Sequence, residues 1–117
     1  MTSSLQKYVK GSNIPGFFWG TDYYPDSTAP DDTSLTSISG LKHIQFRRGT
    51  GGPPITVEAT QATRTIDGVS HAGLSVSAAN MAATLTLVGK WFWRFEVDLV
   101  GDSLPCYSEW QPIIVYE

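Results

Sequence analysis

The stretch from residue 89 to residue 100 constrains the fold more than any other part of this 117-residue chain. From Trp91 onward every second residue is apolar, and the positions between carry the charged side chains Arg94, Glu96 and Asp98. A period of two, with one apolar and one polar face, is the pattern of a half-buried β-strand. The predicted buried face consists of Trp91, Trp93, Phe95, Val97 and Leu99.

A second extended run covers residues 110–116, after Gly101 and Asp102 interrupt the first. We expect these two strands to pair. Upstream, Leu41–Arg48 also alternates and predicts Ile44 and Phe46 on the buried face. The outward positions of that strand are His43, Gln45 and Arg47.

Turn residues divide the middle of the chain into short pieces. Residues 49–54 form a Gly/Pro loop, and residues 55–66 form an extended run in which Ile55, Val57 and Ala59 alternate. Asp67-Gly68 between two such runs is the pattern of a two-residue hairpin turn. The following strand alternates through Leu74 and Val76. Residues 77–83 are the one helix-like piece, a single turn that Ser77 would cap. Six or seven short strands at regular spacing indicate a β-sandwich or a small barrel.

Residues 1–34 differ from the rest of the chain, because prolines and aspartates surround a dense aromatic stretch. This stretch consists of Phe17, Phe18, Trp19, Tyr23 and Tyr24. Aromatic side chains contribute a large free energy when buried, so we expect them to be covered. In one interpretation Phe17–Tyr24 is an edge strand with Trp19, Thr21 and Tyr23 on one face. In the other, which we favour, part of this segment is an arm buried against a neighbouring subunit.

Composition excludes several classes of protein. A length of 117 residues predicts a single domain, and 41% apolar residues are too many for a disordered chain. The net charge of −3, with one adjacent basic pair at Arg47-Arg48, does not fit a nucleic-acid surface. A single cysteine, Cys106, excludes an intrachain disulfide framework. We find no signal-peptide pattern and no apolar run long enough for a membrane span.

Motifs with known chemistry are incomplete throughout the chain. Residues 68–73 resemble a nucleophile elbow but have Ala72 where the second glycine belongs. His43, His71 and Cys106 lack the close spacing of zinc ligands, so we predict no metal site. The acidic positions between 22 and 32 do not follow the order of a calcium loop, and residues 49–52 lack the lysine of a phosphate loop. We therefore expect no catalytic residues, no cofactor and no metal.

Two groups of residues are candidates for contacts with other molecules. Arg47 and Arg48 end a strand at a Gly-rich loop. In one interpretation they are a solvated strand end, and in the other they form ion pairs with an acidic loop such as residues 30–32 of another subunit. Trp91, Trp93 and Phe95 would belong to the core or to a subunit interface. An exposed platform for a sugar ring would instead use Trp19, Tyr23, Tyr24 or Trp110.

The order of these features resembles small β-sandwich modules in the virion proteins of tailed bacteriophages. Those modules have a Leu-Thr-Gly-like strand start, a strand ending in Arg, a Gly/Pro loop, an Asp-Gly hairpin, a Ser-rich helical turn, a Gly-aromatic-x-aromatic strand and a closing strand. The likeness covers residues 35–117. The counterparts here are Leu35–Gly40, Leu41–Arg48, Gly49–Pro54, Asp67-Gly68, Ser77–Ala83, Gly89–Leu99 and Trp110–Tyr116.

The resemblance implies an immunoglobulin-like antiparallel β-sandwich of about seven strands over residues 35–117, preceded by an arm or first edge strand in residues 1–34. It also implies a non-enzymatic structural component of a phage head, tail or baseplate, which is assembled in the host cytoplasm. Its partners would be other virion proteins and further copies of itself, with no nucleic acid and no membrane. The alternative is a carbohydrate- or receptor-binding module that uses surface aromatics. The predicted interface consists of Phe17, Phe18, Trp19, Tyr23, Tyr24, Arg47, Arg48 and Trp110.

Overall fold

The chain folds into two β-sheets with one short helix. The computed structural model describes residues 6–19, 38–49, 51–66, 68–99 and 105–117. In chain order the elements are β1 (Gln6–Val9), β2 (Gly16–Trp19), β3 (Ile38–Arg48), β4 (Ile55–Glu58), β5 (Thr60–Ile66), β6 (Val69–Val76), α1 (Ala78–Thr84), β7 (Gly89–Leu99), β8 (Cys106–Tyr107) and β9 (Gln111–Tyr116).

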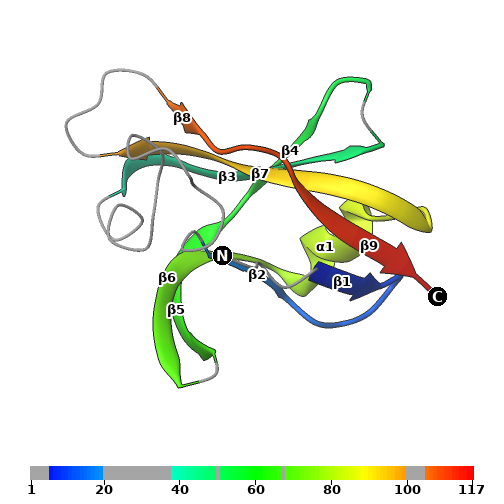
Figure 1. Ribbon diagram of the computed structural model, residues 1–117, viewed down its shortest axis with the longest axis horizontal. Coiled ribbons are helices and arrows are strands. Elements are labelled where there is room, and N and C mark those ends of the chain that lie inside the picture. The colour runs from blue at the N-terminus through cyan, green and yellow to red at the C-terminus, as the bar shows by residue number, and fades with distance from the viewer. Residues whose placement is uncertain (1–5, 20–37, 50, 67, 100–104) are drawn as a thin grey trace.

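Sheet A has the strand order β1-β9-β7-β3-β4, and β8 pairs with the far end of β7. Sheet B has the order β2-β6-β5. Figure 1 shows β3, β7 and β8 of sheet A above α1 and sheet B, while β9 runs down from them toward β1. The predicted all-β sandwich is therefore confirmed. Two details differ: the described residues contain nine strands, and β1 runs parallel to β9 while all other pairs are antiparallel.

The inner face of β7 supplies the centre of the core, as its alternating pattern predicts. Trp93, Phe95 and Val97 are completely buried, and Trp91 is nearly so. The prediction for the side chain of Leu99 lies outside the described residues. This face packs against sheet B within the same chain, so Trp91, Trp93 and Phe95 belong to the core and not to a subunit interface.

The two layers meet through aromatic contacts around Phe18. Its ring lies 4.8 Å from the ring of Trp93 and 5.7 Å from that of Phe46, centroid to centroid. Leu74 and Val76 of β6 complete this contact and are fully buried. The strand that carries Phe18, β2, is an edge strand of sheet B and pairs antiparallel with β6.

The hairpin and the helix form where local sequence signals place them. Ile66 of β5 pairs with Val69 of β6, and Gly68 between them has a φ of 80°, which confirms the predicted turn. Ser77 caps α1, since its Oγ accepts a 3.2 Å hydrogen bond from the Asn80 backbone N–H.

The run predicted as one strand over residues 55–66 is in fact divided between the two sheets. Its first part, β4, pairs with β3 in sheet A, whereas β5 pairs with β6 in sheet B. The change occurs at Ala59, whose N–H donates to the Lys42 carbonyl. Of the alternating residues in this run, Ile55 begins edge strand β4 and is 45% exposed, whereas Val57 is buried.

Candidate functional site

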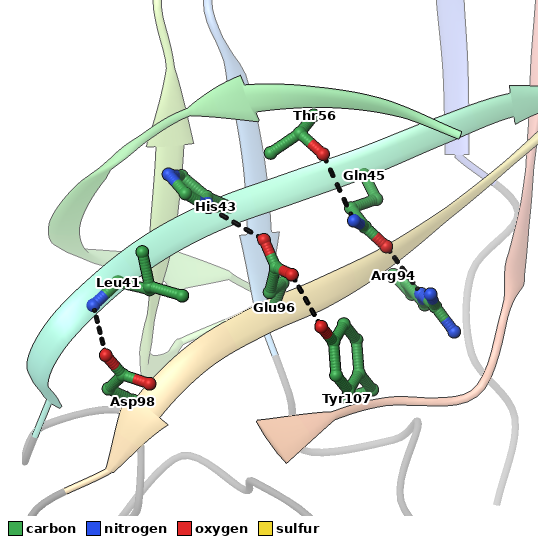
Figure 2. A network of polar contacts seen from close by, with 8 residues as sticks. All are labelled: Leu41, His43, Gln45, Thr56, Arg94, Glu96, Asp98 and Tyr107. Atoms are coloured by element: carbon green, nitrogen blue, oxygen red, sulfur yellow. Dashed lines mark hydrogen bonds and ion pairs between the residues drawn. The ribbon is translucent and has the colours of Figure 1, made fainter. Parts of the chain in front are cut away.

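The outer face of sheet A, which points away from sheet B, carries a connected group of polar and aromatic side chains. Register and alternation place it: Ile44, Phe46 and Phe95 point into the core, so their neighbours along β3 and β7 point outward. The outward residues of β3 are His43, Gln45 and Arg47, as the sequence predicts. Those of β7 are Lys90, Phe92, Arg94, Glu96 and Asp98. Figure 2 shows side chains from β4, β3, β7 and β8 joined across this face.

Gln45 is the centre of one chain of hydrogen bonds. Its Nε2 donates to the Thr56 hydroxyl at 3.1 Å, and its Oε1 accepts from Arg94 Nε at 2.8 Å. Gln45 is only 6% exposed, although it lies on the outward side of the strand. A buried amide needs such partners, since leaving one group unpaired costs about 1–3 kcal/mol. The contacts therefore hold the Arg94 guanidinium in one orientation.

Glu96 is the centre of a second chain. One carboxylate oxygen lies 2.8 Å from His43 Nδ1, and the other accepts a 2.6 Å hydrogen bond from the Tyr107 hydroxyl. Burial raises the pKa of Glu96, but the hydrogen bonds from Tyr107 and His43, with the charges of His43 and Arg94, outweigh burial and leave that pKa below its usual value. The same hydrogen bond to Glu96 raises the pKa of Tyr107. Glu96 is therefore held as a carboxylate across neutral pH.

An aromatic ring in contact with two arginines lies next to these chains. The guanidinium carbon of Arg47 is 4.3 Å from the centroid of the Trp110 ring, and that of Arg94 is 4.4 Å from it. Arg94 also lies 4.5 Å from the centroid of Tyr107. Trp110 is half-buried and Tyr107 is 47% exposed, so both rings remain accessible. We call Arg47, Arg94, Tyr107 and Trp110 the Arg–Trp cluster.

The segment before β9 is anchored so that Trp110 lies over the sheet. Ser108 is buried, and its Oγ accepts a 2.8 Å hydrogen bond from the Phe95 N–H of β7. The Ser108 N–H donates back to the Phe95 carbonyl at 3.3 Å. This reciprocal pair fixes the chain two residues before Trp110, which limits the positions that the ring can take.

The remaining residues of the predicted interface lie apart from the Arg–Trp cluster. Phe18 is fully buried in the core of its own chain, so the prediction that it contacts a neighbouring subunit is wrong. Phe17 is buried on the other side of β2, where it stacks on Trp19 at 5.9 Å and Arg64 covers its ring at 4.9 Å. Arg48 is exposed, and its Nη2 donates to the Val88 carbonyl. Tyr23, Tyr24 and the acidic loop of residues 30–32 lie outside the described residues.

The groups considered for metal binding and catalysis do not assemble into a site in the described part of the chain. His43 belongs to sheet A and bonds to Glu96, while His71 lies on β6 of sheet B beside Trp19. Within the described ranges, no three His, Cys, Asp or Glu side chains are grouped so that they could hold a metal ion. Nor does any helix there have the length and apolar character to cross a membrane.

Sequence reasoning recognised Trp110 and Arg47 but missed Gln45, Arg94, Glu96 and Tyr107 as members of one site. Alternation does place the residues of β3 and β7 on one face, and this was the available signal. Which side chains of the two strands are opposite one another depends on register, which pairs Gln45 with Arg94 and His43 with Glu96. We compared the chain with protein-family models, curated proteins and solved structures. None of the three comparisons found a match.

Proposed function

We propose that this protein is a non-enzymatic structural component of a bacteriophage particle, which acts through protein–protein contacts made by the outer face of sheet A. The single observation that carries the proposal is the Arg–Trp cluster. Trp, Tyr and Arg are the residue types most enriched where protein interfaces concentrate their binding energy. The assignment to a phage particle draws on the resemblance of residues 35–117 to virion β-sandwich modules.

The cluster suits a protein partner because it is ordered before any partner arrives. Arg94 is held by the hydrogen bond to Gln45, and Ser108 anchors the segment that carries Trp110. Ordering a long side chain on binding costs about 0.5–1.5 kcal/mol, and these contacts reduce that cost.

Carbohydrate binding is the second candidate, and the half-buried Trp110 ring is the observation that favours it. Sugar platforms require an open ring face. Guanidinium groups at 4.3 and 4.4 Å already lie over this ring, which leaves less of it for a pyranose. We therefore rank the protein partner first.

The experiment follows the protein into particles. An epitope-tagged copy is expressed during growth of the phage or prophage that encodes the gene, and particles are purified on a density gradient. We expect the tagged protein to band with heads, tails or complete particles. Trp110→Ala and Arg47→Ala should each lower the bound amount several-fold. Arg64→Ala is the matched control, because it also removes a guanidinium stacked on an aromatic ring, but on sheet B.

Tagged protein that remains at the top of the gradient contradicts the proposal. A glycan array probed with the same purified protein tests the second candidate. Binding to the array that Trp110→Ala abolishes, without attachment to particles, would replace the first function by the second. Arg94 is avoided as a test position, because its removal would also leave the buried Gln45 oxygen unpaired.

A further inference from the structure

Charge is divided between the two ends of the outer face of sheet A. The outward residues of β7 read Lys90, Phe92, Arg94, Glu96 and Asp98 in order. Successive outward residues of a strand are about 6.8 Å apart, so two cations and two carboxylates occupy opposite ends of one strand. The change of sign falls between Arg94 and Glu96.

Neighbouring strands extend this division across the sheet. On the basic side Arg47 pairs with Phe92, and Lys7 of β1 pairs with Ile114, which is itself opposite Lys90. On the acidic side Glu58 of β4 lies opposite His43 in the register of β3 and β4, and His43 is the ion-pair partner of Glu96. We call the outward residues Lys7, Arg47, Lys90 and Arg94 the basic half, and Glu58, Glu96 and Asp98 the acidic half.

The cations of the basic half form no ion pair with a described carboxylate, although the charge of Arg94 does act on Glu96. The His43–Glu96 pair is the one ion pair among the described residues, and none of the four cations lies within ion-pair distance of a described carboxylate. Apolar side chains lie between these cations. Phe92, Pro112 and Ile114 are half-buried, while Val9 and Tyr116 are 44% and 40% exposed. An apolar surface edged by unpaired charge is a surface suited to a partner.

We propose that the occupant of this face is a second copy of the same chain, related by a two-fold axis so that the basic half of each copy lies on the acidic half of the other. A two-fold interface uses the same patch twice and has to be complementary to itself. A face with opposite charges at its two ends meets that condition. A purely acidic partner would match only the basic half and would meet repulsion at Glu58 and Asp98.

This inference deepens the proposed function and rests on it for the role of the Arg–Trp cluster, which lies near the change of sign. In the dimer, the cluster would be covered by the partner's copy of the same face. Charge pairs at the periphery would set orientation and association rate, while Trp110 and the apolar residues would supply most of the affinity.

Sedimentation velocity across micromolar to submillimolar concentrations of the purified full-length chain tests the inference. We expect a monomer–dimer equilibrium that weakens as salt rises from about 0.05 M to about 1 M, because the screening length falls to about 3 Å. Trp110→Ala should weaken the dimer at least tenfold. A monomer at every concentration overturns the proposal.

Charge reversal tests the two-fold arrangement itself. Lys90→Glu and Glu58→Lys change exposed side chains that make no hydrogen bond to the rest of the sheet among the described residues, so both variants should fold. Each alone should weaken self-association about tenfold, and an equimolar mixture should recover it, since the basic half that gains a glutamate then lies on the acidic half that gains a lysine. Arg64→Glu on sheet B is the matched control and should leave the equilibrium unchanged.

Failure of the mixture to recover association, or an equal loss with Arg64→Glu, would overturn the two-fold arrangement. If either reversed variant does not fold, as checked by circular dichroism, the salt dependence and Trp110→Ala decide alone. The outcome also separates this inference from the proposed function. A monomer that still bands with particles refutes only the dimer, whereas a dimer that never bands with particles refutes only the particle assignment.

Discussion

Gly73 is the position where the smallest change to the chain should have the largest effect. It lies in β6 opposite Trp19 of β2. A Cβ built on Gly73 would lie 2.1 Å from the Phe18 carbonyl oxygen and 2.9 Å from its carbon. Both are backbone atoms of an adjacent strand, so no side-chain rotation can relieve the contact. Gly73→Ala therefore forces β2 away from β6.

The displacement can be worked from the same geometry. Ordinary contact begins at 3.4 Å, so the 2.1 Å approach has to lengthen by about 1.3 Å. Such a shift weakens the pairing of β2 with β6 and withdraws Phe18 from Trp93, now 4.8 Å away between ring centroids. Overpacking of this kind costs about 1–3 kcal/mol, and we place Gly73→Ala at the upper end because backbone has to move. The melting temperature should fall by roughly 10 °C.

Urea unfolding followed by tryptophan fluorescence measures the effect, with Gly51→Ala as the control. A Cβ on Gly51 has nothing within 4 Å, so this variant should stay within about 0.5 kcal/mol of the parent. Gly16→Ala should be intermediate, because its nearest neighbour at 2.7 Å is the flexible end of Met81. If Gly73→Ala unfolds at the same urea concentration as Gly51→Ala, then β2 does not lie on β6 as described and the reasoning fails.

Three further outcomes follow from local features. Gly68→Val should cost about 1 kcal/mol or more in urea unfolding, because a β-branched residue is strained at a φ of 80°; an unchanged midpoint would place the turn elsewhere. Ser77→Ala should lower the free energy of unfolding by about 1 kcal/mol through loss of the cap on α1. Ser77→Thr should retain most of that stability, because threonine also caps helices, and equal losses for the two variants would argue against capping. Because the folded pKa of Glu96 is lowered from 4.5, its contribution to stability is present above pH 4.5 and is lost as pH falls through the folded pKa. Unfolding free energies measured from pH 7 down to pH 3 should therefore decrease less steeply for Glu96→Gln, and parallel curves would count against the carboxylate's role.

Local pattern alone was enough to predict the elements in which neighbouring residues decide the outcome. The alternation in β7 predicts its buried face because a pleated strand sends successive side chains to opposite sides. Gly68 is suited to its turn because it lacks a Cβ, and Ser77 caps α1 through a contact only three residues away. The face of β3 that carries His43 and Arg47 is predicted for the same reason as that of β7.

The features that depend on residues far apart in the chain were decided by tertiary structure. Nothing local indicates that β1 pairs parallel with β9, or that one extended run passes between the sheets at Ala59, because these pairings compete with others of similar pattern. Phe18 looks the same in sequence whether it contacts a neighbouring subunit or its own core, and only the packing of β2 on β6 decides for the core.

The candidate site belongs to this second category. Trp110 and Arg47 are separated by more than sixty positions, and they meet because Ser108 anchors one segment to β7 while register places the other across from Phe92. Alternation specifies which side of a sheet a residue faces, but not which residue lies beside it on the next strand. The polar pattern of β3 and β7 therefore predicted a solvated face, and their register joined the side chains of that face into ordered hydrogen-bonded chains.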